Sequence, residues 1–242
     1  MKDNREFRPY VSEGTVNFGI NPDMPYAVEE ALNRLRVNIR FLGSDIKKIM
    51  ITSADENEGK SFVAMNIWRQ MVTAGDKCVL LDVDMRKSNM VDIYNMRRED
   101  GLEIKGTSQF LSDSSTDIRE IILHTDKAYG DIIPNSENII NPSMLLESRR
   151  FEIMVDWLSK NYRYVFLDSP PLGLVSDAVR IGSLCDGAIL TVRSNQTSRS
   201  AVRNAIQQLE RAGCPLLGIV LNRASNGKGG YYAKYGYGYY GK

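Results

Sequence analysis

The stretch ITSADENEGKS, residues 51–61, decides the fold. It leads from an apolar run through a polar loop into a helical pattern, and it ends on Gly59, Lys60 and Ser61. A phosphate-binding loop reads G-x-x-x-x-G-K-[ST] between a strand and a helix, and here Ala54 stands in the place of the first glycine. Backbone N–H groups at the start of such a helix bind phosphate oxygens, while the lysine reaches the β/γ-phosphates and the hydroxyl holds Mg²⁺. The alternative is an ordinary strand–loop–helix turn in which Gly-Lys-Ser occurs by chance.

Carboxylates follow two other apolar runs. VLLDVDMRKS, residues 79–88, carries Asp82 and Asp84, and YVFLDSPP, residues 164–171, carries Asp168. Ligands of open parallel sheets bind at the carboxyl ends of the strands, and alternate strand residues project alike, so these acids and the loop serine predict a Mg²⁺ site. Each acid alone could equally cap a following helix. Together with the loop, they indicate a nucleotide triphosphatase core.

Short apolar runs alternate with helical patterns along most of the chain. Strands are predicted at residues 49–51, 78–81, 130–134, 164–167, 188–192 and 217–221. Helices are predicted at residues 26–42, 59–74, 144–158 and 199–212. Strands that are apolar throughout and alternate with helices indicate an α/β fold, with a mostly parallel sheet covered by helices on both faces.

The two ends of the chain differ from this pattern. We assign residues 1–25 to an N-terminal arm, residues 26–226 to the P-loop domain and residues 227–242 to a flexible tail. The tail contains six Gly, six Tyr, three Lys and one Ala, a composition that cannot form a packed core. It could serve as a linker, as a set of accessible tyrosines, or as an adhesive segment for partners or RNA.

Composition excludes several classes of function. Thirty-one basic against thirty acidic residues argues against a strongly basic nucleic-acid binder, so no nucleic-acid partner is expected. Three widely spaced cysteines favour a reducing compartment, and a single histidine leaves almost no material for a Ser-His-Asp triad or a histidine metal site. No apolar run reaches the roughly 18–20 residues of a membrane span, and the N-terminus does not read as a signal peptide. A cytoplasmic protein is expected.

These motifs together resemble a family. The P-loop, the D-x-D-x-R run and the D-x-P-P run are similar to the Walker A, A′ and B motifs of the bacterial tyrosine kinases, the cytoplasmic autokinases of capsule and exopolysaccharide assembly. The resemblance covers about residues 26–226, includes NPSMLLES at 141–148, and extends to the tyrosine-rich C-terminus. It implies a P-loop α/β domain related to division-site and partition ATPases. Those relatives carry a second lysine where Asp55 stands here, which favours the kinase interpretation.

The resemblance implies ATP and Mg²⁺ as cofactors and assigns roles to individual residues. Nucleotide binding would involve Asn57, Glu58, Gly59, Lys60, Ser61, Phe62, Asn222 and Arg223. The catalytic residues would be Lys60, Asp82, Asp84 and Arg86, and the metal ligands Ser61, Asp82 and Asp168. One of Asp82 and Asp84 would take the proton of the incoming tyrosine. For Arg86 the alternative is a surface pair with a neighbouring acid, and for Asn222 and Arg223 it is an ordinary polar loop.

Four positions depart from the family pattern. Glu56 and Asn57 replace Pro-Gly in the loop, and Ser88 stands where a proline is usual. The family's oligomer helix reads E-x-x-R-x-x-R; Glu30 and Arg36 match it as interface residues, whereas Asn33 replaces the first arginine, with Arg34 beside it.

The implied function is an ATP-dependent protein-tyrosine autokinase that regulates polysaccharide synthesis and export. It would phosphorylate the tail in trans at Tyr231, Tyr232, Tyr235, Tyr237, Tyr239 and Tyr240. The implied partners are a separate membrane adaptor with an activating cytoplasmic segment, further copies in a ring-like oligomer, and a cognate tyrosine phosphatase; the adaptor would recruit the protein to the inner face of the plasma membrane. The alternatives are a nucleotide-switched positioning ATPase and a non-catalytic P-loop scaffold that binds an adaptor.

Overall fold

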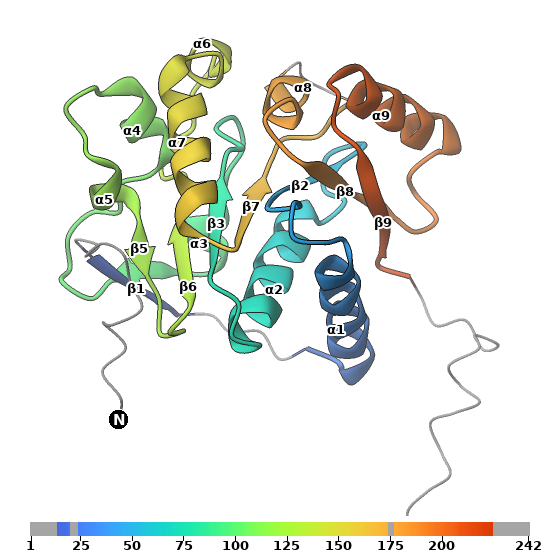
Figure 1. The fold of residues 1–242 in the computed structure, drawn as a ribbon, viewed down its shortest axis with the longest axis horizontal. Helices are drawn as coiled ribbons and strands as arrows, with labels where there is room; N and C mark the ends of the chain where they lie inside the picture. Colours follow the sequence, from blue (N-terminus) through green and yellow to red (C-terminus); the bar gives the residue numbers. More distant parts are fainter. Residues whose placement is uncertain (1–13, 20–23, 174–176, 225–242) are drawn as a thin grey trace, which may run out of the picture.

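The fold is a twisted α/β sheet covered by helices (Figure 1). The computed structural model describes residues 14–19, 24–173 and 177–224, and within them one sheet has the strand order β4-β1-β5-β6-β3-β7-β2-β8-β9. The strands are β1 (Gly14–Phe18), β2 (Lys48–Ser53), β3 (Cys78–Asp82), β4 (Met96–Arg98), β5 (Leu123–His124), β6 (Gly130–Ile133), β7 (Tyr164–Asp168), β8 (Gly187–Arg193) and β9 (Leu216–Asn222). The run from β6 to β9 is parallel throughout, which confirms the predicted fold class.

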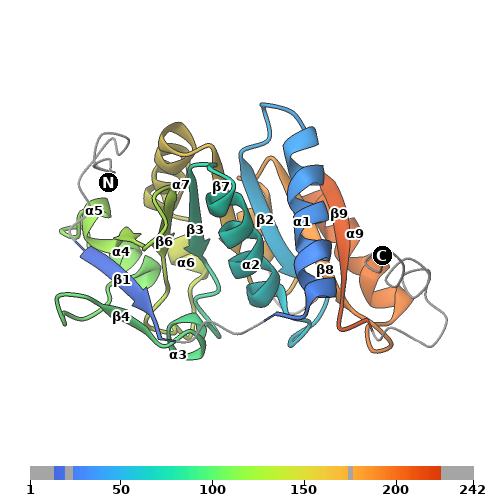
Figure 2. The same cartoon turned by 90° about the horizontal axis from the view of Figure 1, so that it is seen from below.

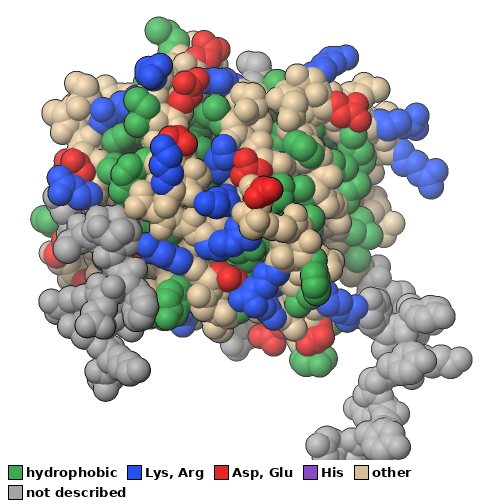
Figure 3. Space-filling view, viewed as in Figure 1, with side chains coloured by type: hydrophobic (Ala, Val, Ile, Leu, Met, Phe, Trp, Pro, Cys, Tyr) green, Lys and Arg blue, Asp and Glu red, His purple; other side chains and the backbone are tan. Residues whose placement is uncertain are grey.

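Helices cover both faces of the sheet. They are α1 (Tyr26–Phe41), α2 (Lys60–Thr73), α3 (Met90–Ile93), α4 (Thr107–Ser112), α5 (Ile118–Ile121), α6 (Ser143–Leu146), α7 (Arg149–Asn161), α8 (Asp177–Gly182) and α9 (Arg199–Arg211). Each face of the sheet has its own buried hydrophobic cluster. One includes the inner side of α2 and part of α1, and the other includes the inner sides of α7, α8 and α9. Figures 1 and 2 show α1 and α2 lying side by side on their face. On the side seen in Figure 3, basic and acidic side chains are interspersed.

The N-terminal arm contains a strand that the sequence did not predict. Residues Gly14–Phe18 pair in parallel with β5 and antiparallel with β4, and Val16 is fully buried. This segment therefore belongs to the sheet, although the sequence alone assigned it to an N-terminal arm. The two-residue β5 and the three-residue β4 were also missed, because such short strands have too few alternations to form a pattern.

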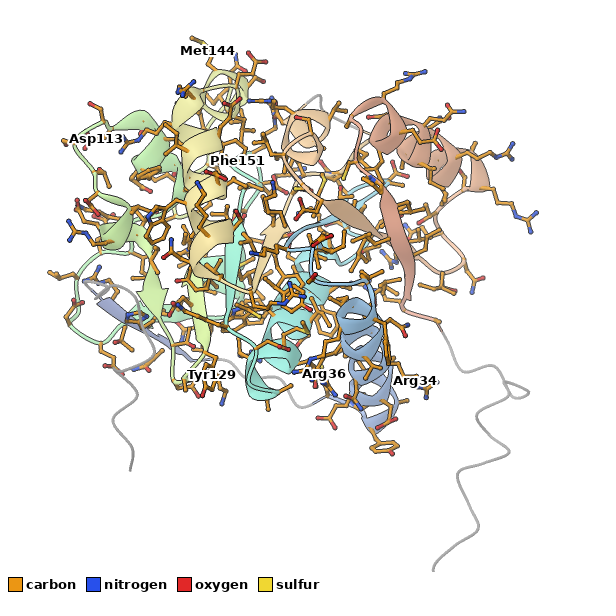
Figure 4. The ribbon with its side chains drawn as sticks, in the orientation of Figure 1. Arg34, Arg36, Asp113, Tyr129, Met144 and Phe151 are labelled. Atoms are coloured by element: carbon orange, nitrogen blue, oxygen red, sulfur yellow. The ribbon has the colours of Figure 1, made fainter. Side chains whose placement is uncertain are left out.

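The helix predicted at residues 144–158 is two helices. α6 ends at Leu146, and α7 begins after Ser148, whose side chain accepts a hydrogen bond from the backbone N–H of Phe151. A serine at this position stabilises a new helix start, because it satisfies an N–H that has no partner within the helix. Figure 4 shows Met144 at the outer end of α6 and Phe151 inside α7 against the sheet.

Coverage by helices is incomplete at the β9 edge. Ile219 and Leu221 are both about half exposed, at 50% and 58%, although the sequence predicted a strand buried on both faces. β9 pairs only with β8 among the described strands, and edge strands of this kind keep one row of backbone groups free.

Candidate functional site

The strand order brings the three predicted motifs together. β7 lies between β3 and β2, so the strands that precede Asp82, Asp168 and the P-loop are neighbours. The two aspartates are paired across the sheet at their Cα atoms, and both side chains are almost completely buried. The prediction that the carboxylates and the loop lie together at the carboxyl ends of the strands, where ligands of parallel sheets bind, is therefore confirmed.

The P-loop adopts the backbone that phosphate binding requires. Asn57 has a φ of +59° and Gly59 a φ of +91°, and Gly59 is the N-cap of α2. Asparagine tolerates the left-handed region better than most residues, so it can replace the family's glycine at this point. Among the described residues, no side chain caps α2 at Gly59, and its first turn carries no acid. The N–H groups of Lys60, Ser61 and Phe62 are thus available to an anion.

The Glu58 side chain is hydrogen-bonded within the protein. It is buried, and its carboxylate accepts hydrogen bonds from the backbone N–H groups of Ala54 at 2.8 Å and Asp55 at 3.0 Å, and from the hydroxyl of Thr197. Its carbonyl oxygen accepts a bond of 2.8 Å from Asn222 Nδ2. Glu58 therefore braces the loop against the β8–α9 connection and the end of β9. A direct role of Glu58 in nucleotide binding stays a prediction.

Lys60 lies among the acidic strand ends. Its Nζ is 2.7 Å from Asp84 Oδ2 and 3.8 Å from Asp168 Oδ1. Burial alone would lower the pKa of Lys60, but attraction to Asp168, Asp84 and Asp82 raises it above its usual value. The lysine is therefore fully charged. In the unliganded protein its ammonium group partly neutralises the carboxylates, and in a nucleotide complex it would bind phosphate oxygens instead.

The carboxylates fit a divalent cation. Burial raises the pKa of Asp82 and of Asp168, and repulsion between the two raises that of Asp82 further. Asp168 Oδ1 is buried and has no hydrogen-bond partner among the described residues. An acceptor of this kind is costly unless a ligand meets it, and Mg²⁺ prefers oxygen donors. No preformed group of three metal-ligating side chains occurs in the described part of the chain, as expected for an ion bound mostly through one or two carboxylates, a hydroxyl and the phosphates.

Asp82 and Asp84 hold different partners. β3 ends at Asp82, so strand alternation does not extend to Asp84. Asp84 bonds to Lys60, whereas Asp82 accepts hydrogen bonds from the Asp84 backbone N–H at 3.1 Å and from the Ser88 hydroxyl. Both carboxylates nevertheless line the same site.

Arg86 is bound to an acid outside the phosphate region. Its Nε lies 2.5 Å from Oδ2 of the buried Asp177, and its Nη1 donates to the Ile140 carbonyl at 3.1 Å. Ser143 donates a further bond of 2.7 Å to Asp177. The structure therefore agrees with the alternative for Arg86, in which its guanidinium pairs with a neighbouring acid. This acid, Asp177, is buried and not on the surface.

Asn222 has both ends of its amide occupied. Its Nδ2 donates to Glu58, and its Oδ1 accepts from the backbone N–H of Arg223. A Cβ on Gly59 would collide with the same Nδ2. Asn222 thus supports the P-loop, while the Arg223 side chain is exposed and the Phe62 side chain packs partly into the α1–α2 core. Contact of Asn222 and Arg223 with a base stays a prediction.

The predicted oligomer residues lie on α1. Arg36 donates two hydrogen bonds to Asn33 Oδ1 of its own helix, at 3.1 and 2.6 Å. The guanidinium that would pair with Glu30 of another subunit is therefore bound to Asn33. Arg34 and Arg36 leave α1 on opposite sides (Figure 4). The role of Glu30 and Arg36 at an interface stays a prediction. All six tail tyrosines lie outside the described residues.

Sequence reasoning missed the residues that hold the site in place. They are Ser88, Asn138, Ser143, Asp177 and Thr197. Asp177 and Thr197 carry no motif, and they are 91 and 139 positions from their partners. Ser88 offered a signal, because it departs from the family pattern two residues after Arg86.

Comparison with known proteins agrees with this geometry. The family described as "AAA domain" matches residues 46–212. The chain is 35% identical over 215 residues to a protein named "Tyrosine-protein kinase CpsD" from Streptococcus agalactiae, covering 88% of this chain and 90% of that protein. No helix in the described residues is long and apolar enough to span a bilayer.

Solved structures show the same fold. The chimerical protein CapA2B2 matches with a TM-score of 0.74 and 32% identity, covering 84% of this chain and 87% of that one. The kinase domain of the Escherichia coli tyrosine kinase ETK matches with a TM-score of 0.73 and 26% identity, covering 91% and 87%. The septum site-determining protein MinD of Pyrococcus horikoshii, complexed with Mg-ADP, matches with a TM-score of 0.61 at 21% identity over 76% and 72%, which shows a common fold.

The chain thus has the fold, the P-loop and the two acidic strand ends, and its similarity to the named tyrosine kinase extends over most of its length. A nucleotide-binding P-loop NTPase domain accounts for all of these observations. The chain belongs to the bacterial tyrosine-protein kinases, which are built on an AAA-type P-loop domain.

Proposed function

We propose that this protein is an ATP- and Mg²⁺-dependent protein-tyrosine kinase that phosphorylates its own tail between subunits and thereby regulates capsular or exopolysaccharide synthesis and export. The observation that carries the kinase chemistry is the contact of Lys60 with Asp84 and Asp168 at the mouth of a phosphate-binding loop. Membership of the tyrosine kinases, together with a tail that contains half of the chain's tyrosines, makes the tail the acceptor.

Nucleotide binding exchanges the partners of Lys60. The ammonium leaves Asp84 and binds the β/γ-phosphates, which the N–H groups at the start of α2 also contact. Asp82, Asp168 and Ser61 would hold Mg²⁺, directly or through water, and the ion would supply charge neutralisation on the transferred phosphoryl group. Binding of cations beside Asp82 and Asp168 stabilises their ionised forms, which burial disfavours in the unliganded protein.

Release of Lys60 also frees Asp84. A carboxylate without its ammonium partner can accept the proton of a tyrosine hydroxyl, whose pKa of about 10 makes it a poor nucleophile at neutral pH. The exchange therefore gives Asp84 the role of base and leaves Asp82 with the metal. In this proposal, phosphate binding and activation of the base are one event.

The end of β9 limits how the tail reaches the site. Asn222 and Asp82 end strands four positions apart in the sheet, which corresponds to about 19–20 Å at a strand spacing of 4.7–4.9 Å. Tyr231 lies nine positions after Asn222, and chain statistics for a Gly-rich sequence of nine residues give a span of roughly 15–18 Å on average. The more distal tyrosines reach further, so chain length alone permits phosphorylation within one subunit. Transfer between subunits is supported by the family resemblance and needs a direct test.

The test mixes two proteins. The acceptor carries Asp82→Asn and the intact tail, and the enzyme is active but truncated after Asn226, so it has no tail. Labelled ATP and an antibody against phosphotyrosine report transfer to the acceptor. Phosphotyrosine on the acceptor establishes transfer between subunits. If the acceptor stays unlabelled, and full-length protein labels itself at a rate per molecule that is independent of concentration, transfer occurs within one subunit.

Two further components belong to the proposal. The partners are a membrane adaptor whose cytoplasmic segment activates the kinase and recruits it to the inner face of the plasma membrane, further copies of the chain, and a cognate tyrosine phosphatase. Each phosphate adds about −1.5 to −2 charge, so two modifications neutralise the +3 charge of the three tail lysines and further ones make it negative. Comparing the labelling rate with and without the adaptor segment tests the activation directly.

A further inference from the structure

The Ser88 hydroxyl contacts the acidic site directly. It donates its single hydrogen to Asp82 Oδ2, while Asp82 Oδ1 accepts the Asp84 backbone N–H. Both oxygens of a carboxylate that is only 1% exposed are therefore held from one connected segment, residues 82–88. An Asp82 side chain bonded on both oxygens has little rotational freedom.

Ser88 is itself held by a second loop. Its backbone N–H donates to Asn138 Oδ1 at 3.0 Å, and its carbonyl accepts from Asn138 Nδ2 at 3.1 Å. The next residue, Ile139, donates its N–H to the Met85 carbonyl at 2.6 Å. The Asn138 amide thus pairs with Ser88 as a neighbouring strand would, and it fixes the backbone from which the hydroxyl reaches Asp82.

We propose that Ser88 is a positioning residue for the phosphoryl-transfer site: its hydroxyl, aligned by Asn138, fixes the Asp82 carboxylate in the orientation that binds the nucleotide-associated metal ion. The inference rests on the proposed kinase function. A metal-binding carboxylate that is itself hydrogen-bonded presents its free lone pairs in one direction, and loss of such an outer contact typically weakens metal binding or activity 10- to 100-fold.

The competing explanation is purely structural. The Ser88 hydroxyl also accepts a bond of 3.4 Å from the Met90 backbone N–H at the start of α3, so it could serve only to begin that short helix. That role predicts a loss of stability in Ser88→Ala with no change in metal affinity. The positioning role predicts a change in metal affinity whether or not stability falls.

The experiment measures metal binding in the absence of any acceptor. Mn²⁺ is titrated into the full-length protein with saturating ADP, and free Mn²⁺ is followed by electron paramagnetic resonance. We expect Ser88→Ala to weaken Mn²⁺ binding about 10-fold or more and Ser88→Thr, which keeps the hydroxyl, to bind as the wild type does. Ser115→Ala is the matched control, because Ser115 is exposed and, among the described residues, its hydroxyl bonds to Asp113 alone. Asn138→Ala should weaken binding in the same direction, and combining it with Ser88→Ala should add little.

Two results overturn the proposal: Mn²⁺ affinity unchanged in Ser88→Ala, or Ser88→Thr as weak as Ser88→Ala. If Ser88→Ala fails to fold, the exposed Asn138→Ala replaces it, and unchanged affinity in that variant is equally decisive. A wild type that binds Mn²⁺ with ADP but never forms phosphotyrosine defeats the kinase proposal and leaves this test intact.

Discussion

Lys60 Nζ lies 2.7 Å from Asp84 Oδ2, so the unliganded protein holds its phosphate-binding lysine in an internal ion pair. Both side chains are largely buried, and Asp82 and Asp168 add negative charge beside them. The pair protects the acidic strand ends from mutual repulsion, and nucleotide binding must break it. A substitution of Lys60 therefore changes stability as well as catalysis.

Lys60→Met should abolish phosphoryl transfer and also destabilise the unliganded protein by about 3 kcal/mol or more, because it leaves Asp84 buried without its partner. Chemical denaturation checks the free energy of unfolding. Lys60→Met combined with Asp84→Asn should recover most of the stability and remain inactive. Equal stability of the single variant and the wild type contradicts the role of the ion pair.

Asp82→Asn should have the opposite effect on stability. Burial and repulsion from Asp168 raise the pKa of Asp82, so above the unfolded pKa of about 3.9 its ionisation opposes folding. We expect Asp82→Asn to lose activity and to stabilise the unliganded protein by about 0.5–2 kcal/mol at pH 7. The sign follows from proton binding: the native state keeps the proton longer than the unfolded chain as the pH rises from about 4.

The advantage of Asp82→Asn should accordingly disappear below about pH 4, where the wild-type carboxyl is protonated in both states. Denaturation of both proteins from pH 3.5 to 7.5 measures this difference. An advantage that is constant over the whole range would show that ionisation of Asp82 is not its cause.

The strand ends could be predicted because their chemistry is local. Each of the apolar runs before Lys60, Asp82 and Asp168 is followed directly by its functional residues, and parallel strands bring such ends to one edge of the sheet. The partners of these residues could not be predicted in the same way. Thr197 reaches Glu58 from a loop with no motif, and the contact depends on the packing of β8 and α9 against the P-loop.

The N-terminal strand shows the same limit for the fold. Residues Gly14–Phe18 form a strand through pairing with β4 and β5, more than seventy positions away in the sequence. Five residues give too few alternations to distinguish a strand from a loop. Its existence depends on tertiary contacts, and burial of Val16 is what makes it part of the core.

Self-association should depend on Asn33, since Asn33 Oδ1 accepts two hydrogen bonds from Arg36. If Glu30 and Arg36 pair between subunits, Glu30→Ala with Arg36→Ala should shift the protein toward monomer in light scattering. Asn33→Ala should release Arg36 and shift it toward oligomer. Tyr26→Ser, an exposed change at the start of α1, is the control. If the mass is the same in all variants, α1 has no interface role.

The pair of Arg86 and Asp177 permits a separation of catalysis from structure. Among the described residues, removing Arg86 leaves the buried Asp177 with Ser143 as its remaining side-chain partner, so Arg86→Met should destabilise the protein by about 3 kcal/mol. Adding Asp177→Asn removes the uncompensated charge and should recover most of that loss. Activity measured in the double variant then reports the role of Arg86 itself. Because the guanidinium is bound to Asp177 and the Ile140 carbonyl, we expect tail phosphorylation to recover with stability. A stable double variant that is still at least 100-fold slower at saturating ATP would show that Arg86 leaves Asp177 during the reaction and acts on the phosphoryl group.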